Sequence, residues 1–162
     1  MTMELPKTKK DCVIQPYNDS YKEQIIAVWE KSVCATHTFL AYSDITYYKK
    51  IISDMDFNAI QTFCLMNKNT ILGFIGVVGR KIEMLFLYPD IMKQGYGKML
   101  VQYAVEKLKA SMVDVNEQNL GALEFYRKCG FVVYERTDKD DEGKDYPILK
   151  MQLDTQNITR LK

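Results

Sequence analysis

The sequence predicts an α/β fold of the α+β type, with a mixed, mostly antiparallel sheet and helices on both of its faces. Short apolar runs and helical patterns follow one another in the order β, α, α, β, β, β, α, β, α, β, β. The run 82–88 is apolar almost throughout, which is typical of a central strand covered on both faces. Neither a repeat nor a linker interrupts the 162 residues, so we expect a single domain over 1–162.

The first part of the chain predicts one strand and two helices. A strand is expected around 13–17, followed by a helix that the cap cluster 18–20 opens. The apolar residues of that helix recur on one face: Ile25, Ile26, Trp29 and Val33. After a link over 35–42, Ser43 is expected to cap a second helix with an apolar face of Ile45, Tyr48, Ile51 and Ile52.

The remaining elements follow from apolar periodicity and turn residues. Strands are expected at 61–66, 71–78, 82–88, 112–115, 131–137 and 146–153, and helices at 95–110 and 119–128. Gly130 is expected just past the end of the second of these helices, and the tail 155–162 is expected to fray.

Charge and composition narrow the class of protein. Lys and Arg number 22 against 21 Asp and Glu, so we expect neither nucleic acid nor an anionic membrane as partner. The longest nonpolar run, 71–79, is shorter than the roughly 18 residues of a membrane span, and no signal peptide pattern is found, so a cytoplasmic protein is expected. The four cysteines lack metal-site spacing, which predicts free thiols and no metal. A monomer and a homodimer both remain possible.

A glycine-containing turn follows the apolar strand and opens a helix at Gly95. Such a turn points several backbone N–H groups at one place, which suits a phosphate. The dinucleotide-binding pattern fails because Leu100 stands where a glycine is needed, and the P-loop pattern fails because Met99 stands where Ser or Thr is needed. An ordinary strand-to-helix turn remains an alternative.

Two motifs together resemble those of the GNAT superfamily of acyl-CoA-dependent N-acyltransferases. The segment 92–97, Met-Lys-Gln-Gly-Tyr-Gly, is similar to the family's pyrophosphate loop Q/R-x-x-G-x-G/A. The family's downstream signature N-x-x-A-x-x-F-Y-x-x-x-G-F is intact: Asn119, Ala122, Phe125, Tyr126, Gly130 and Phe131. The order of elements agrees with the family along nearly the whole chain.

The resemblance implies a site for acetyl-CoA. The backbone of Leu85, Phe86 and Leu87 would bind the pantetheine arm as an added strand does. The pyrophosphate would be held by Met92, Lys93, Gln94, Gly95, Tyr96, Gly97 and Lys98, and Asn119 would contact the cofactor, cap its helix, or do both. Met92 replaces the polar residue at the head of the family's loop, and Lys93 is expected to compensate in part.

The resemblance also implies two catalytic residues. Tyr126 would protonate the departing thiolate, since a phenol has a pKa above that of the thiol; a packed core tyrosine is the alternative. Glu83 would act as general base for the amine. Strand alternation puts Glu83 on the face of Leu85 and Leu87, so a solvated charge at the edge of the strand is the alternative.

The resemblance implies that the link after the first helix borders the acceptor pocket, with His37 and Tyr42 as substrate-binding residues and Tyr47 and Tyr48 in the same cleft. A structural histidine and packed aromatic residues are the alternatives. The acidic loop 138–145 would attract a cationic amine, although a solvated hairpin tip explains it equally well. The resemblance thus implies an N-acetyltransferase that moves an acetyl group from acetyl-CoA to a primary amine by direct attack in a ternary complex. A non-catalytic acyl-CoA sensor of the same fold is the first alternative, and a nucleotide-binding protein the second.

Overall fold

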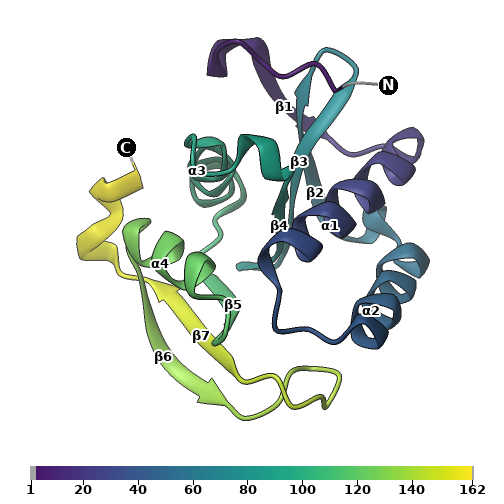
Figure 1. The fold of residues 1–162 in the computed structure, drawn as a ribbon. Coiled ribbons are helices and arrows are strands. Elements are labelled where there is room, and N and C mark those ends of the chain that lie inside the picture. Colours follow the sequence, from purple (N-terminus) through teal and green to yellow (C-terminus); the bar gives the residue numbers. More distant parts are fainter. Residues whose placement is uncertain (1–2, 162) are drawn as a thin grey trace.

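A computed structural model describes residues 3–161 of the chain, and residues 1, 2 and 162, at the ends of the expected domain, lie outside it. Seven strands form one sheet, in which neighbouring strands follow the order β1-β2-β3-β4-β5-β7-β6 (Figure 1). The strands are β1 (Cys12–Pro16), β2 (Gln61–Asn67), β3 (Thr70–Val78), β4 (Lys81–Leu87), β5 (Met112–Asn116), β6 (Phe131–Thr137) and β7 (Ile148–Leu153). All neighbours are antiparallel except β4 and β5, which are parallel. The expected mixed sheet is confirmed.

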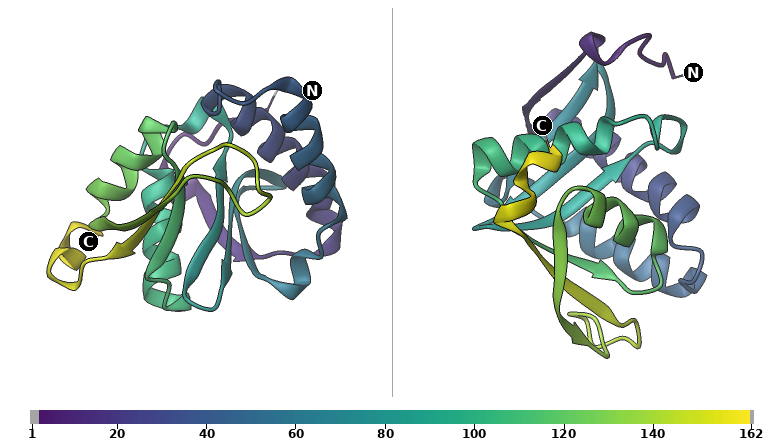
Figure 2. Two further views of the ribbon diagram at one scale, coloured as in Figure 1. Left: turned by 90° about the horizontal axis from the view of Figure 1, so that it is seen from below. Right: turned by 90° about the vertical axis from the view of Figure 1, so that its left-hand side faces the viewer.

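Different helices cover the two faces of the sheet (Figure 2). The helices α3 (Tyr96–Leu108) and α4 (Leu120–Lys128) pack on one face, and α1 (Lys22–Thr36) and α2 (Tyr42–Asp54) on the other. The first core contains, among others, Leu72, Ile75, Leu100, Val101 and Phe131, and the second Ile25, Val28, Phe57, Ile71 and Phe74. Each such side chain contributes about 1.5–3 kcal/mol on burial, so both layers hold the central strands in place.

A β-bulge interrupts β4. Gly76 of β3 pairs with Met84, and Val77 pairs with Ile82, so Glu83 is an extra residue without a partner in β3. An inserted residue of this kind locally breaks the alternation of side chains between the two faces of a strand.

The bulge changes the side of the sheet on which Glu83 lies. Ile82, Leu85 and Leu87 pack with the core under α3 and α4, whereas Met84 packs with the core under α1 and α2. Glu83 lines a cavity beside Met84. The expectation that Glu83 shares the face of Leu85 and Leu87 is therefore wrong, because simple alternation ignores the inserted residue.

The helix starts differ in one place from those expected. Asn18 accepts a hydrogen bond from the N–H of Ser20 at 3.0 Å and opens a short 3-10 turn, η2 (Asp19–Tyr21), which leads into α1. Ala41, not Ser43, stands at the N-cap of α2, and Ser43 lies inside the first turn. Gly130, with a φ of +96°, follows the end of α4 as expected.

The C-terminal tail is ordered over its described part, in contrast to the frayed end that we expected. Residues Thr155–Leu161 form a 3-10 helix, η5, and Leu161 is only 2% exposed within the core under α3. A Cβ at Gly130 would lie 2.9 Å from the carbonyl oxygen of Asn157, so the glycine permits this close approach of the tail. One buried leucine thus anchors a tail whose sequence is polar; Lys162 lies outside the described residues.

Candidate active site

The parallel strands β4 and β5 separate soon after they begin. They pair only at Lys81 with Met112 and at Ile82 with Val113, so the rest of β4 has no partner in β5. Lys81 Nζ lies 2.5 Å from Asp114 Oδ2 and joins the strands where they still touch. One backbone edge of 84–87 therefore faces a gap, where an extended ligand can bind as an added strand does.

The turn before α3 presents a row of unpaired backbone donors. The first turn of a helix has N–H groups with no acceptor within the helix, here those of Tyr96, Gly97 and Lys98. No hydrogen bond is recorded from the N–H groups of Lys93, Gln94 or Gly95 to another described residue. Lys93 and Gly95 have positive φ angles of 60° and 89°, which curve the turn around one point. These donors and the positive helix end fit a pyrophosphate.

Gln94 and Lys9 place polar groups around this turn, which begins with the apolar side chain of Met92. The Gln94 side chain donates to the carbonyl oxygen of Asp90 at 3.0 Å and ties the turn together. Lys93 is exposed and does not bond within the turn. The ammonium of Lys9, which precedes β1, lies so close to Gly95 that a Cβ there would clash with it. Lys9 is a cation at the turn that sequence reasoning missed, because it lies more than 80 residues before the motif.

Gly97 allows α4 to approach α3. A Cβ at this position would lie 3.2 Å from Phe125 Cζ, which is closer than ordinary van der Waals contact. The Phe125 ring in turn packs against that of Tyr126, with centroids 4.9 Å apart. The glycine of the turn and the tyrosine of α4 are therefore coupled through one aromatic ring.

Tyr126 lies in the core under α3 and α4 with 6% of its surface exposed. Burial raises the pKa of its phenol above the usual value, so the hydroxyl keeps its proton at neutral pH. The hydroxyl makes no hydrogen bond to another described residue. Among the described residues, no fully buried side-chain oxygen or nitrogen lacks a partner, so this hydroxyl is not fully enclosed. It is therefore available to donate a proton to a ligand.

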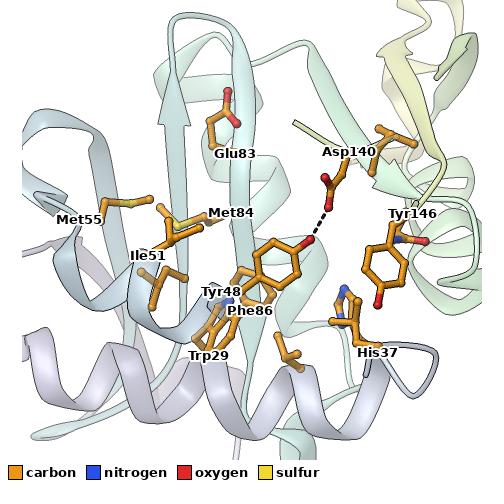
Figure 3. A pocket seen from close by; sticks show the side chains of 15 residues that line it. Trp29, His37, Tyr48, Ile51, Met55, Glu83, Met84, Phe86, Asp140 and Tyr146 are labelled. Carbon is orange, nitrogen blue, oxygen red and sulfur yellow. Dashed lines mark hydrogen bonds between the residues drawn. The ribbon is translucent and has the colours of Figure 1, made fainter. Parts of the chain in front are cut away.

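A cavity of about 280 Å³ opens on the other face of the sheet, between α1, α2 and β4 (Figure 3). We call it the acceptor pocket because the link 35–42, where that pocket is expected, contributes His37 and Leu40 to its wall. Apolar side chains form most of its wall: Trp29, Val33, Leu40, Ile51, Ile52, Met55, Met84, Phe86 and Ile148. Its polar lining comes from His37, Tyr48, Glu83, Asn116, Asp140 and Tyr146.

Glu83 is the carboxylate of this pocket that belongs to the central strand. Its side chain is 37% exposed, and Lys81 Nζ lies 3.7 Å away, beyond hydrogen-bond distance. The bulge described above points it beside Met84, next to the place where β4 and β5 separate. A carboxylate there can hold an ammonium group or accept its proton.

His37 caps the end of α1 and lies in the acceptor pocket. Burial lowers the pKa of its imidazole to about 4, so the ring is neutral at pH 7. Its Nδ1 lies 2.8 Å from the hydroxyl of Thr36, which itself donates to the carbonyl oxygen of Ser32. Nδ1 therefore carries the proton, and Nε2 is left as an acceptor facing Asn119 Nδ2 at 3.5 Å.

Asn119 has the capping role that the sequence suggested. Its side-chain oxygen accepts a hydrogen bond from the N–H of Ala122 at 3.1 Å at the start of α4. Through His37, it also brings the end of α1 to the start of α4. The wall of the pocket therefore touches the start of the helix that carries Tyr126.

Tyr42, which is expected to bind the acceptor, does not line this pocket. It is the first residue of α2 and is 84% exposed. Tyr48, which is expected in the same cleft, lines the pocket. The acidic loop 138–145 also differs from a solvated hairpin tip, because its Asp140, with the adjoining Tyr146, contributes to the wall of the pocket (Figure 3).

Comparison with known proteins identifies the family to which this chain belongs. The Acetyltransferase (GNAT) family matches residues 23–131 of the chain. The chain belongs to the GNAT acetyltransferase family. The peptidyl-lysine N-acetyltransferase YjaB of Salmonella typhimurium is 38% identical to it over 129 residues, which cover 80% of this chain and 89% of YjaB. The protein of the same name from Escherichia coli is 34% identical, with 80% and 88% covered.

Solved structures agree with the fold. The solution structure of apo YjaB from Escherichia coli superimposes with a TM-score of 0.79 at 32% identity, over 87% of this chain and 96% of that one. A PaiA N-acetyltransferase from Thermoplasma acidophilum, solved with coenzyme A, has a TM-score of 0.67 at 21% identity, over 87% and 98%.

The chain is therefore an N-acetyltransferase, which moves the acetyl group of acetyl-CoA to an amine. The turn at 92–98, with its unpaired donors, fits a co-substrate that carries a pyrophosphate. In the described part of the chain, no helix is long and apolar enough to cross a membrane.

Proposed function

We propose that this GNAT enzyme acetylates the side-chain amine of lysine residues in peptides or proteins. The observation that carries the proposal is the acceptor pocket, whose wall is mostly apolar and whose carboxylate, Glu83, lies beside the gap. A lysine side chain has the matching form, an aliphatic stem that ends in one cation. The pocket's volume of about 280 Å³ is at the small end for ligand sites, which suits a single side chain. The YjaB relatives named above support the same acceptor.

We assign binding of acetyl-CoA to the gap and the turn. The backbone of Leu85, Phe86 and Leu87 would hold the pantetheine arm, and the N–H groups of residues 93–98 would hold the pyrophosphate. Lys9, Lys93 and Lys98 would add positive charge. The bound co-substrate supplies an acetyl thioester at the place where α4 and the pocket meet.

We assign the chemistry to groups on the two sides of the gap. Glu83, directly or through water, would take the proton of the lysine ammonium, and the free amine would attack the thioester carbonyl. The N–C bond forms, the C–S bond breaks, and Tyr126 would give its proton to the departing sulfur. The raised pKa of Tyr126 keeps that proton available. Among the described residues the site brings together no activated nucleophile, so transfer would be direct within a ternary complex.

His37 would orient the acceptor. Its Nε2 faces Asn119 Nδ2, which holds the neutral ring in the wall of the pocket, where it would pack against the acceptor. We also propose that the enzyme works in the reducing cytoplasm, in keeping with its four free thiols.

The test is a Tyr126→Phe variant assayed with acetyl-CoA and a lysine peptide. We expect kcat to fall by about 10²-fold or more, the usual contribution of a general acid, with unchanged affinity for CoA in a calorimetric titration. The aromatic packing should survive because only the hydroxyl is lost. Undiminished turnover would remove Tyr126 from the mechanism.

A further inference from the structure

The start of β4 carries two residues of opposite charge, Lys81 and Glu83, on the side of the sheet where the acceptor pocket lies. Ile82 between them packs in the core under α3 and α4, as does its partner Val113 of β5. Because side chains alternate along a strand, Lys81 and Asp114, which adjoin these two residues, point to the opposite face. The ammonium of Lys81 therefore lies between the carboxylates of Asp114 and Glu83.

Lys81 is shared unequally between these two carboxylates. Its Nζ lies 2.5 Å from Asp114 Oδ2 but 3.7 Å from Glu83 Oε1, so only Asp114 is within hydrogen-bond distance. Burial lowers the pKa of the Lys81 ammonium, but the hydrogen bond to Asp114 and the charges of both carboxylates and of Asp141 together raise that pKa above its usual value. Lys81 thus stays charged at neutral pH and is held by Asp114.

The other titratable groups around Glu83 leave it unpaired. Those that line the pocket with it are uncharged or already hydrogen-bonded: His37, Tyr48, Asp140 and Tyr146. Lys22 donates to the carbonyl oxygen of Met55, which also lines the pocket, at 3.1 Å. Figure 3 shows Glu83 apart from the bonded pair of Tyr48 and Asp140. Among the described residues, only Lys81 is placed as a cation next to Glu83.

We propose that Asp114 is a positioning residue that holds Lys81 away from Glu83 and so leaves Glu83 free to accept a proton from the acceptor amine. The inference rests on the proposed function, because it treats Glu83 as the general base. A carboxylate that pairs closely with an ammonium group binds a proton less readily and is the weaker base. The Lys81–Asp114 pair therefore sets the lower end of the pH range in which the enzyme works.

The test follows kcat/KM for a lysine peptide against pH in Asp114→Asn, Lys81→Gln and the double variant. In Asp114→Asn the freed ammonium pairs with Glu83, so the acid limb of the profile should move down by about one pH unit and the plateau should fall by up to about tenfold. Lys81→Gln leaves Asp114 as an unpaired anion near Glu83, so the acid limb should move up. The double variant loses both charges and should return close to the wild type.

Glu135→Gln is the matched control, because it removes a carboxylate from an ion pair with Lys150 that joins β6 and β7 outside the pocket. Its profile should match that of the wild type. Carbon-13 NMR of glutamate-labelled protein titrates the Glu83 carboxylate without turnover, and Glu83→Gln identifies its signal. The midpoint of that titration should move with the acid limb in each variant.

A Glu83 midpoint that is the same in Asp114→Asn and the wild type would overturn the inference. So would a double variant that stays as slow as Asp114→Asn, which is the result expected if the pair only joins the two strands. Midpoints that shift as expected in an enzyme that acetylates no lysine peptide, or that keeps full activity in Glu83→Gln, would instead refute the proposed function.

Discussion

Replacing Gly97 with alanine tests whether the turn and the catalytic helix are coupled as the structure indicates. The new Cβ would lie 3.2 and 3.3 Å from Phe125 Cζ and Cε2 and 3.5 Å from Leu87 Cδ1. The first two contacts are tighter than van der Waals separation, so the Phe125 ring or the whole of α4 must move by a few tenths of an ångström. The Tyr126 ring, 4.9 Å from that of Phe125, would be displaced with it.

The stability effect is the difference of two terms. Alanine gains up to about 1 kcal/mol over glycine inside a helix, whereas overpacking a core contact costs about 1–3 kcal/mol. Gly121 of α4 is the matched control, because the nearest atom to its Cβ would be Asn119 Oδ1 at 3.8 Å, an ordinary contact. Gly121→Ala should therefore gain about 0.5–1 kcal/mol, and Gly97→Ala should be less stable than Gly121→Ala by about 1–3 kcal/mol.

Urea unfolding followed by Trp29 fluorescence measures both free energies, and steady-state assays measure kcat. We expect kcat to fall up to about tenfold in Gly97→Ala, since small displacements of a catalytic group reduce turnover, and to stay unchanged in Gly121→Ala. If Gly97→Ala proved as stable as Gly121→Ala and fully active, the coupling of Gly97 to Tyr126 through Phe125 would be refuted.

Three further variants test the charges of the site. Lys9→Ala should weaken CoA binding up to about fivefold and reduce its salt dependence, the range for an exposed charge, whereas Lys7→Ala should not; calorimetry at two salt concentrations measures both. Glu83→Gln should lower kcat/KM for a lysine peptide by about 10²-fold without changing CoA affinity, and full activity would exclude Glu83 as the base. Because burial lowers the pKa of His37 from 6.5 to about 4, the unfolded chain binds a proton between these pH values that the folded chain does not. The free energy of unfolding should therefore fall by up to about 3 kcal/mol from pH 6.5 to 4, and an equal slope in His37→Gln would contradict this origin.

The order of strands and helices could be predicted from the sequence because each element carries its own local signal. The apolar run of β4 and the helical spacing after Gly95 both gave the right element to within a few residues. The cap at Asn119 could also be predicted, since the side chain of an asparagine before an apolar helical pattern accepts a hydrogen bond from the backbone N–H three residues later.

The parts that escaped prediction depend on contacts between distant segments. The bulge at Glu83 follows from pairing with β3, so alternation along β4 alone put the carboxylate on the wrong face. The approach of Lys9 to Gly95 and the bond from Tyr48 to Asp140 join residues about 90 apart in the chain. Leu161 had no local pattern to mark it as buried. Tertiary pairing decides each of these, and no single window of sequence contains it.

The most direct test of the account is mass spectrometry of a lysine peptide with a blocked N-terminus after incubation with the enzyme and acetyl-CoA. The account predicts an acetyl group on the lysine side chain, formed at a rate that depends on enzyme concentration and falls in Tyr126→Phe. Transfer only to peptides with a free α-amine, or none to any peptide, would contradict the claim that the acceptor pocket receives a lysine side chain.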